Sequence, residues 1–211
     1  KKCLITAGPT LENIDPRRYI SNYSSGKQGY EIAKLLVNRG ANVTLISGPT
    51  NIQPQQNVKV IMVKTADEML IQTNKYNKKI DIAVFCAAIA DFKVKKISNK
   101  KIQKDTLTTL KLIKNIDILK KISTQKTNRP KFIVGFSAET DSKILAIKKM
   151  KIKNCNMIIY NKISRKNKVF GLDENKISIL TKNKIVNYSK FSKLKCANLI
   201  VDSIYKEIKN K

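Results

Sequence analysis

The chain has 211 residues, enough for one domain with a sizeable core, and 42% of them are hydrophobic. It carries 43 lysines and arginines against 15 acidic residues, a formal net charge of +28, and it has no histidine. The lack of histidine excludes serine–histidine and cysteine–histidine catalysis and histidine-based zinc sites, so any chemistry must use positioning, lysine charge, carboxylates, backbone dipoles or a soluble metal ion.

Apolar runs typical of buried strands alternate with helical patterns along the chain. The expected strands are Lys2–Ala7, Asn42–Ile46, Val58–Val63, Ile80–Cys86, Lys131–Phe136 and Asn156–Tyr160. The expected helices are Lys27–Arg39, Thr65–Tyr76, Asn115–Ser123, Thr140–Lys153 and Ser189–Ile208. This alternation predicts a single α/β domain over residues 1–211, a doubly wound, mostly parallel Rossmann-like sheet with helices on both faces.

Local signals support these elements. Lys176–Leu180 and Lys184–Tyr188 flank a short turn and predict an added β-hairpin. Gly40 is expected to cap the end of the first helix. Thr65, followed by Glu68, forms a capping-box pattern at the start of the second helix.

A long polar loop separates the first strand from the helix at Lys27. It is too long to be a simple connector, and it follows the carboxyl end of a strand, where α/β sheets bind ligands. The backbone N–H groups of Ser24, Ser25 and Gly26 could bind an anion at the helix N-terminus, so we interpret them as a phosphate loop. The glycine spacing does not fit a dinucleotide fingerprint, and there is no Walker loop.

Two later strand ends carry small and polar residues. In CAAIAD, Ala87 and Ala88 would let a ligand approach the backbone. Asp91 would accept hydrogen bonds from a ligand, support a magnesium ion, or cap a helix or turn. In VGFSAET, Gly135 would permit close approach, and Phe136 would either stack on a base or belong to the core.

Lysine-rich segments leave two interpretations open. Asp91–Thr106 and Lys162–Gly171 both follow expected strands, so they are either solvated loops or part of the ligand-binding edge. Lys149 and Lys153, four residues apart on a helix, would either grip a triphosphate or be solvated.

The high positive charge also has two interpretations. It is typical of proteins that bind nucleic acids or membrane surfaces. However, the lysines are spread along the whole chain and arginine is scarce, whereas a phosphate-binding face would favour arginine for bidentate contacts. We therefore favour compositional drift and expect neither a nucleic-acid nor a membrane partner. No stretch approaches the roughly 20 apolar residues of a membrane span, and the start does not look like a signal peptide.

The four cysteines, Cys3, Cys86, Cys155 and Cys196, are scattered and lack C-x-x-C spacing. We interpret them as reduced thiols in a cytoplasmic protein.

Taken together, the motifs resemble those of the phosphopantothenate–cysteine ligase family. They occur in family order over nearly the whole chain, as ITAGPT, DPRRYISNYSSGKQG, AAIAD, KIQK, NIDI, VGFSAET and the element that runs from Lys149 through Lys153 and Asn154 to Asn161. The resemblance implies CTP-dependent ligation of 4′-phosphopantothenate to L-cysteine through an acyl-cytidylate, with Mg²⁺ or Mn²⁺, giving 4′-phosphopantothenoylcysteine, CMP and pyrophosphate. An ATP-using ligase of the same fold remains the alternative, followed by a basic nucleic-acid-binding module.

The resemblance also implies residue roles. Asn22 and Lys101 would be catalytic, and Arg18, Asn22, Ala87 and Ala88 would bind phosphopantothenate. The nucleotide-binding residues would be Asp91, Lys101, Ile116, Asp117, Ile118, Leu119, Phe136, Lys149 and Lys153. No metal ligands are assigned. The chain departs from the family pattern at Tyr23, where histidine is frequent, at Gln103, where a lysine is expected, and at Ile116, where proline is expected.

The resemblance implies partners as well. Family members are homodimers whose lysine-bearing lid lies near the partner subunit. In many bacteria the domain is the C-terminal half of a fusion with a flavin-dependent decarboxylase, and FMN belongs only to that other half. The chain therefore looks like an excised ligase domain or a separate partner of such a decarboxylase.

Overall fold

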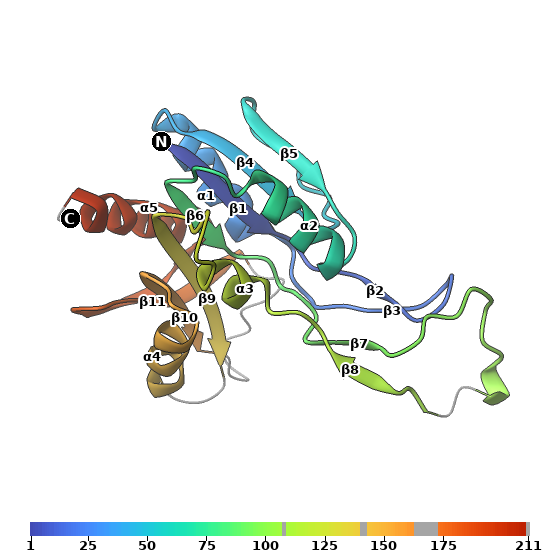
Figure 1. Ribbon diagram of the computed structural model, residues 1–211. Coiled ribbons are helices and arrows are strands. Elements are labelled where there is room, and N and C mark those ends of the chain that lie inside the picture. Colours follow the sequence, from blue (N-terminus) through green and yellow to red (C-terminus); the bar gives the residue numbers. More distant parts are fainter. Residues whose placement is uncertain (107–108, 140–142, 163–172, 210–211) are drawn as a thin grey trace.

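The computed structural model describes residues 1–106, 109–139, 143–162 and 173–209 (Figure 1). Within these residues the central sheet has eight strands in the order β12-β11-β10-β9-β6-β1-β4-β5. The strands are β1 (Lys2–Ala7), β4 (Asn42–Ser47), β5 (Val58–Met62), β6 (Ile82–Phe85), β9 (Phe132–Glu139), β10 (Met157–Lys162), β11 (Glu174–Thr181) and β12 (Ile185–Ser192).

The sheet is doubly wound, as the sequence predicts. Strands β5, β4, β1, β6, β9 and β10 run parallel. The chain moves outward from β1 to β5 and then returns to place β6 on the other side of β1, so the strand order reverses between β1 and β6. The predicted hairpin is confirmed: β11 and β12 add to β10 as an antiparallel edge.

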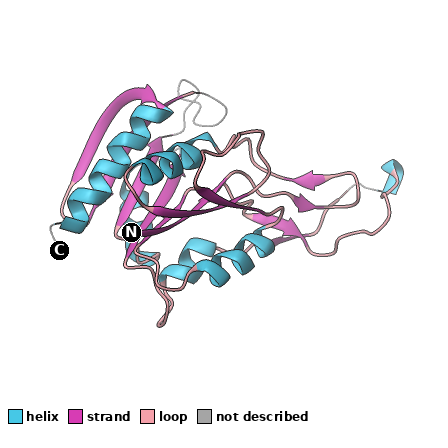
Figure 2. Ribbon diagram, turned by 90° about the horizontal axis from the view of Figure 1, so that it is seen from above, coloured by secondary structure: helices cyan, strands magenta, loops and turns pink. Residues whose placement is uncertain are grey.

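Helices cover both faces of the sheet (Figures 1 and 2). They are α1 (Lys27–Asn38), α2 (Ala66–Tyr76), α3 (Ile118–Ser123), α4 (Lys143–Ile152) and α5 (Lys193–Lys209). Strand β1 is buried on both sides: Cys3 and Ile5 pack in the core with α1 and α5, while Leu4 packs in the core with α2 and α3. This explains why the parallel strands read as continuous apolar runs.

The helix caps form as the sequence predicts. Gly40 takes a positive φ of 77° just after α1, and its N–H donates to the Val37 carbonyl at 2.8 Å. The Thr65 hydroxyl accepts the N–H of Glu68 at 3.2 Å, and the Glu68 carboxylate accepts the N–H of Lys64 at 2.7 Å.

Some predicted boundaries are wrong. Helix α5 begins at Lys193 and not at Ser189, because residues 190–192 still pair with β11. Helix α3 begins at Ile118 and not at Asn115, because the Asp117 carboxylate accepts the Lys120 N–H at 3.0 Å and caps the helix there. The first residues of the helix expected from Thr140, and most of the Lys162–Gly171 segment, lie outside the described residues.

Two short hairpins project beyond the carboxyl edge of the sheet (Figures 1 and 2). One pairs β2 (Glu12–Asn13) with β3 (Tyr19–Ile20), and the other pairs β7 (Phe92–Val94) with β8 (Leu112–Lys114). A one-turn helix, η1 (Lys104–Thr106), lies in the β7–β8 connection. We call residues 12–20, 92–106 and 109–114 the arm. The sequence did not reveal these pairs, since strands of two or three residues are too short to show an alternating pattern.

Candidate functional site

A pocket of about 150 Å³ lies at the carboxyl edge of the sheet. It is lined by Ser24, Ser25, Gly26, Lys27, Gln28, Cys86, Ala87, Ala88, Phe136, Ala138, Asn161, Asn175 and Lys193. The structure thus brings together the predicted phosphate loop, the two alanines after β6 and the phenylalanine of β9. Doubly wound sheets bind ligands at this edge, beside the point where the strand order reverses.

Backbone hydrogen bonds lock the two loops at the reversal point. The Ala88 N–H donates to the Gly8 carbonyl at 2.9 Å, and the Ala88 carbonyl accepts the Thr10 N–H at 3.2 Å. The same Ala88 carbonyl accepts the side-chain amide of Asn22 at 3.0 Å. This bond uses one of the two amide N–H groups of Asn22, so the other N–H and the amide oxygen remain available to a ligand.

The predicted phosphate loop, Ser24 to Gly26, requires glycine at its last position. Gly26 is the N-cap of α1 with a positive φ of 78°, and a Cβ there would lie 2.7 Å from the Thr50 methyl carbon. The first turn of α1 contains no acidic residue, and its N-cap residue has no side chain to cap it. The Ser24 hydroxyl accepts the N–H of Gly26 at 3.3 Å, and the Ser25 hydroxyl accepts the N–H of Lys27 at 3.5 Å. Because the N-terminus of a helix carries partial positive charge, this end of α1 is suited to an anionic group.

The pocket floor contains polar residues that sequence reasoning missed. Lys193 is only 5% exposed, and its burial lowers the pKa of its ammonium group, an effect partly offset by the nearby charge of Asp173. Gln28 donates to the Lys193 carbonyl at 3.2 Å, and Asn175 donates to Asn161 at 3.1 Å. The amide oxygens of Gln28 and Asn175 have no hydrogen-bond partner among the described residues. Buried polar atoms without partners suggest that a ligand completes this floor.

These floor residues come from distant parts of the chain. Lys193 begins α5, Asn175 lies on the antiparallel strand β11, and Gln28 lies on α1, so no local motif joins them. The available signal was weak: Asn161 follows the apolar run of β10, whereas Asn175 lies between Glu174 and Lys176 at the polar start of β11.

Phe136 lines the pocket, but Gly135 does not, although the sequence predicts that Gly135 permits the close approach of a ligand. A Cβ on Gly135 would lie 2.7 Å from the Leu119 side chain and 2.9 Å from that of Ile158. Its small size therefore admits core side chains and not a ligand. Ile118 and Leu119 are correspondingly buried in the core, with Ile116 packed against them.

The predicted triphosphate lysines are paired with carboxylates. Lys149 contacts Glu139, which also accepts the Ser137 hydroxyl at 2.9 Å, and Lys153 lies 3.1 Å from the Asp117 carboxylate. Burial tends to raise the pKa of Glu139, but these hydrogen bonds and the lysine charges bring it below its usual value. None of these four charged residues lines the pocket.

Asp91 also lies outside the pocket lining. Its side chain is exposed, and its main-chain carbonyl accepts the N–H of Asn115 at 2.8 Å, which closes the base of the β7–β8 hairpin.

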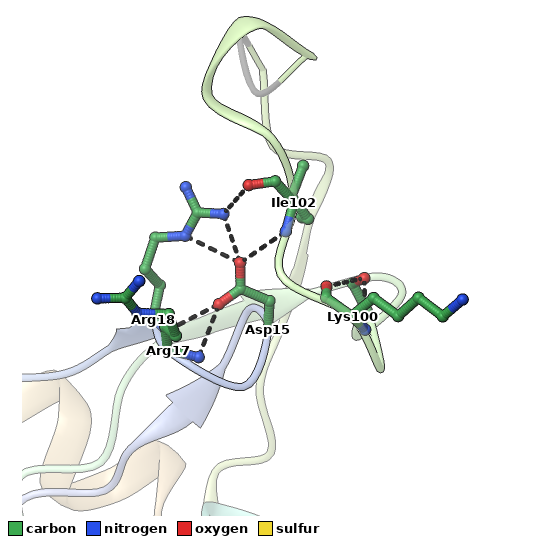
Figure 3. A network of polar contacts seen from close by, with 6 residues as sticks. Asp15, Arg17, Arg18, Lys100 and Ile102 are labelled. Carbon is green, nitrogen blue, oxygen red and sulfur yellow. Dashed lines mark hydrogen bonds and ion pairs between the residues drawn. The ribbon is translucent and has the colours of Figure 1, made fainter.

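Arg18 and Lys101 are on the arm. The guanidinium of Arg18 contacts the Asp15 carboxylate and the Ile102 carbonyl (Figure 3), and Arg18 does not line the pocket. Lys101 is exposed on the neighbouring segment. A single chain therefore does not bring Lys101 into the pocket with Ser24 and Gly26.

Comparisons with known proteins establish the family. Residues 1–208 match the family model described as DNA/pantothenate metabolism flavoprotein C-terminal domain. The chain belongs to this family.

The chain matches only part of each of its curated relatives. It is similar to the coenzyme A biosynthesis bifunctional protein CoaBC of Haemophilus influenzae, with 45% identity over 95% of the chain and 50% of the relative. The corresponding protein of Borreliella burgdorferi is 41% identical over 97% of the chain and 52% of the relative. The chain thus spans about half the length of these relatives.

Solved structures agree with this assignment. The crystal structure of the C-terminal domain of a CoaBC protein superposes with a TM-score of 0.84 and 33% identity, covering 100% of this chain and 97% of the other. A Cab2 mutant in complex with phosphopantothenate-cysteine shares the fold, with a TM-score of 0.71 and 19% identity over 100% of this chain and 88% of the other. The family resemblance inferred from the motifs is confirmed.

Three further features of this family member bear on its chemistry. All four cysteines are free, as predicted, and burial raises the pKa of the Cys86 thiol at the pocket to about 12. The part of the chain that the structure describes contains no cluster of three or more histidine, cysteine or acidic side chains able to hold a metal. Nor does it include a helix whose length and apolar character would allow it to span a bilayer.

Proposed function

We propose that this chain ligates 4′-phosphopantothenate to L-cysteine, using CTP, in the cytoplasm. The observation that carries the proposal is the pocket, whose lining combines the N-terminus of α1, Lys27 and Lys193 and includes no carboxylate side chain. Such a lining is suited to phosphorylated substrates. The 33% identity with the C-terminal domain of a CoaBC protein supports the choice of reaction.

The proposed reaction has two steps. The carboxylate of 4′-phosphopantothenate attacks the α-phosphate of CTP, forming an acyl-cytidylate and releasing pyrophosphate. The amine of cysteine then attacks the acyl carbon, and CMP leaves. Positioning and charge neutralisation are sufficient for such steps, which agrees with a chain that lacks histidine.

Residues that line the pocket, together with Asn22, which bonds to Ala88 but does not itself line the pocket, take distinct parts in this scheme. The N-terminus of α1 and the Lys193 ammonium would hold phosphate oxygens. Asn22, held on one side by the Ala88 carbonyl, would direct its second amide N–H toward the acyl oxygen and stabilise the charge that develops there. Phe136 would provide the aromatic face for the base.

Lys101 would act on the nucleotide phosphates from the arm of a second copy of the chain. The arm projects from the body of its own chain (Figures 1 and 2), which favours delivery to a neighbouring pocket. It also carries large apolar side chains with exposed fractions from 39% to 54%, namely Tyr19, Phe92, Ile97, Leu110, Leu112 and Ile113. Because a concentration of exposed apolar residues is typical of an interaction surface, we propose a homodimer.

Magnesium, or manganese in its place, would arrive with the nucleotide. The pocket has no acidic side chain, and the described residues form no resident metal cluster. Magnesium in phosphoryl-transfer sites is commonly held by substrate phosphates and water, so this donor set fits a metal–nucleotide complex better than a resident ion. A flavin-dependent decarboxylase, which would hold FMN, is proposed as a fused or associated partner.

The proposal is tested by measuring pyrophosphate release from CTP and magnesium, with phosphopantothenate added and cysteine present or omitted. We expect release to require phosphopantothenate and to continue through many turnovers only with cysteine. The same assay with ATP decides the nucleotide, and faster turnover with ATP would favour the ATP-using alternative. No release with either nucleotide would overturn the proposal.

A further inference from the structure

The most heavily hydrogen-bonded carboxylate of the described arm lies outside the pocket. Asp15 is 2% exposed and lies in the turn between β2 and β3. One of its oxygens accepts the N–H groups of Arg17 and Arg18, each at 2.9 Å. The other accepts the Arg18 Nε at 2.9 Å, contacts Arg18 Nη2, and accepts the N–H of Ile102 at 3.2 Å (Figure 3).

The same ion pair holds the second polar group of the Ile102 backbone. Arg18 Nη2 donates to the Ile102 carbonyl at 2.8 Å, so Asp15 and Arg18 together bind both the N–H and the C=O of one residue (Figure 3). Ile102 is 87 residues away from Asp15 in the sequence and directly follows Lys101. A long-range contact therefore fixes the backbone beside this lysine.

A second attachment lies just before the lysines. The N–H of Ser98 donates to the Ile14 carbonyl at 3.0 Å, and the Ser98 hydroxyl donates to the Lys100 carbonyl at 2.6 Å. Lys100 and Lys101 thus lie between two points at which the segment is bound to the β2–β3 hairpin. Figure 3 shows the Lys100 side chain pointing away from the Asp15 carboxylate. The network holds the backbone and leaves the lysine ammonium groups exposed.

We propose that Asp15 and Arg18 are positioning residues, which hold the segment 98–102 so that it presents Lys101 at a fixed place. Arg18 then acts through the Ile102 backbone and not by touching phosphopantothenate. The catalytic part of this inference rests on the proposed function of Lys101. Charge-assisted hydrogen bonds are strong, and here Nε and Nη2 of the planar Arg18 guanidinium both contact one Asp15 oxygen, which suits the pair to holding a loop.

The kinetic test is a double-mutant cycle between Asp15→Asn and Lys101→Gln. Misplacement of a catalytic group by about 1 Å costs on the order of 10²-fold, so Asp15→Asn should lower kcat by roughly ten- to a hundredfold and leave the KM for phosphopantothenate nearly unchanged. In the Lys101→Gln background, Asp15→Asn should cause no further loss. Losses that multiply would show independent roles and overturn the proposal.

Arg18→Lys separates positioning from substrate binding. It keeps the positive charge but removes the guanidinium that contacts both the Asp15 carboxylate and the Ile102 carbonyl, so we expect a lower kcat. A raised KM for phosphopantothenate with unchanged kcat would instead place Arg18 at the substrate and overturn its positioning role. The matched control is Asp67→Asn, since Asp67 is 59% exposed and pairs with Lys93 at the base of the arm at 2.5 Å; its kcat should stay near that of the parent chain.

Limited trypsin cleavage tests the attachment without any turnover. Asp15→Asn should speed cleavage after Lys100 and Lys101 at least several-fold relative to the parent chain and Asp67→Asn, while the thermal unfolding of the body remains cooperative. If Asp15→Asn does not fold, Arg18→Lys serves for the same measurement. Unchanged cleavage would overturn the attachment. Faster cleavage in a chain without ligase activity would support the attachment while rejecting the proposed function.

Discussion

The pocket lies on the ends of buried parallel strands, whereas the arm consists of hairpins with strands of two or three residues. At the pocket, the Ala88 backbone is fixed by sheet-like hydrogen bonds to Gly8 and Thr10 at the centre of the fold. In the arm, the lysine-bearing segment is fixed by the Asp15–Arg18 pair and by the Ser98 backbone. The comparison indicates that the geometry of the pocket is built into the fold, while the placement of Lys101 depends on a few polar contacts.

Among substitutions in the arm that leave the pocket unchanged, Lys101→Gln should have the largest effect on activity. We expect kcat for pyrophosphate release to fall roughly 10²-fold or more, the loss typical when a group that stabilises transition-state charge is removed. Lys100→Gln is the matched control, because the neighbouring lysine is also exposed on the same segment. Equal effects of the two substitutions would show that only the general positive charge of the arm matters.

Among substitutions in the pocket that leave the arm unchanged, Lys193→Met should have the largest effect on substrate binding. Removing the buried ammonium should raise the KM for a phosphorylated substrate roughly tenfold, since a hydrogen bond to a charged group contributes about 1.5–3 kcal/mol. Comparing the KM for CTP with that for phosphopantothenate identifies which phosphate Lys193 contacts. If neither KM changes, Lys193 is not part of the phosphate site.

The same substitution has a predictable effect on stability. The pKa of Lys193 is lower in the folded chain than in the unfolded chain, so the unfolded state binds more protons between the two pKa values. The resulting stability penalty is full below the folded-state pKa and diminishes as the pH rises through it. Lys193→Met should therefore raise the free energy of unfolding at neutral pH and flatten its rise in the alkaline range, as urea unfolding at several pH values can check.

Gly26, which lines the pocket, can be compared with Gly40, which lies just after α1. Gly26 and Gly40 have nearly equal positive φ values, 78° and 77°, but only a Cβ at Gly26 would meet a neighbour, whereas nothing lies within 4 Å at Gly40. Gly40→Ala should cost about 1 kcal/mol of unfolding free energy from backbone strain. Gly26→Ala should cost more and also weaken nucleotide binding, and equal costs in urea unfolding would show that the Thr50 contact relaxes freely.

The smallest effect is expected at the ion pair between Lys153 and Asp117. The Asp117 side chain is 42% exposed, and exposed pairs contribute about 0–1 kcal/mol, so Lys153→Gln should hardly change the melting temperature. A large drop in nucleotide affinity in this variant would show that Lys153 leaves Asp117 to bind phosphate, as the family resemblance implies.

The sequence predicts the body of the molecule well because long, buried, β-branched strands and amphipathic helices carry strong periodic signals. It also predicts that Ser24, Ser25 and Gly26 lie at the carboxyl edge of the sheet with the alanines after β6, since each group lies within one continuous motif. The pocket floor could not be predicted, because Gln28, Asn175 and Lys193 meet only through the tertiary fold. The Asp15–Ile102 contact is of the same kind: it joins two loops that are 87 residues apart.

The central claim is that the pocket of one chain works with the arm of another. It is tested most directly by co-expressing Asn22→Asp and Lys101→Gln chains with different affinity tags and purifying the mixed dimer. Each variant alone should be nearly inactive in pyrophosphate release. The mixed dimer should regain a substantial share of the parent activity, since one of its sites combines an intact pocket with an intact arm. A mixed dimer as inactive as either variant alone would contradict the claim.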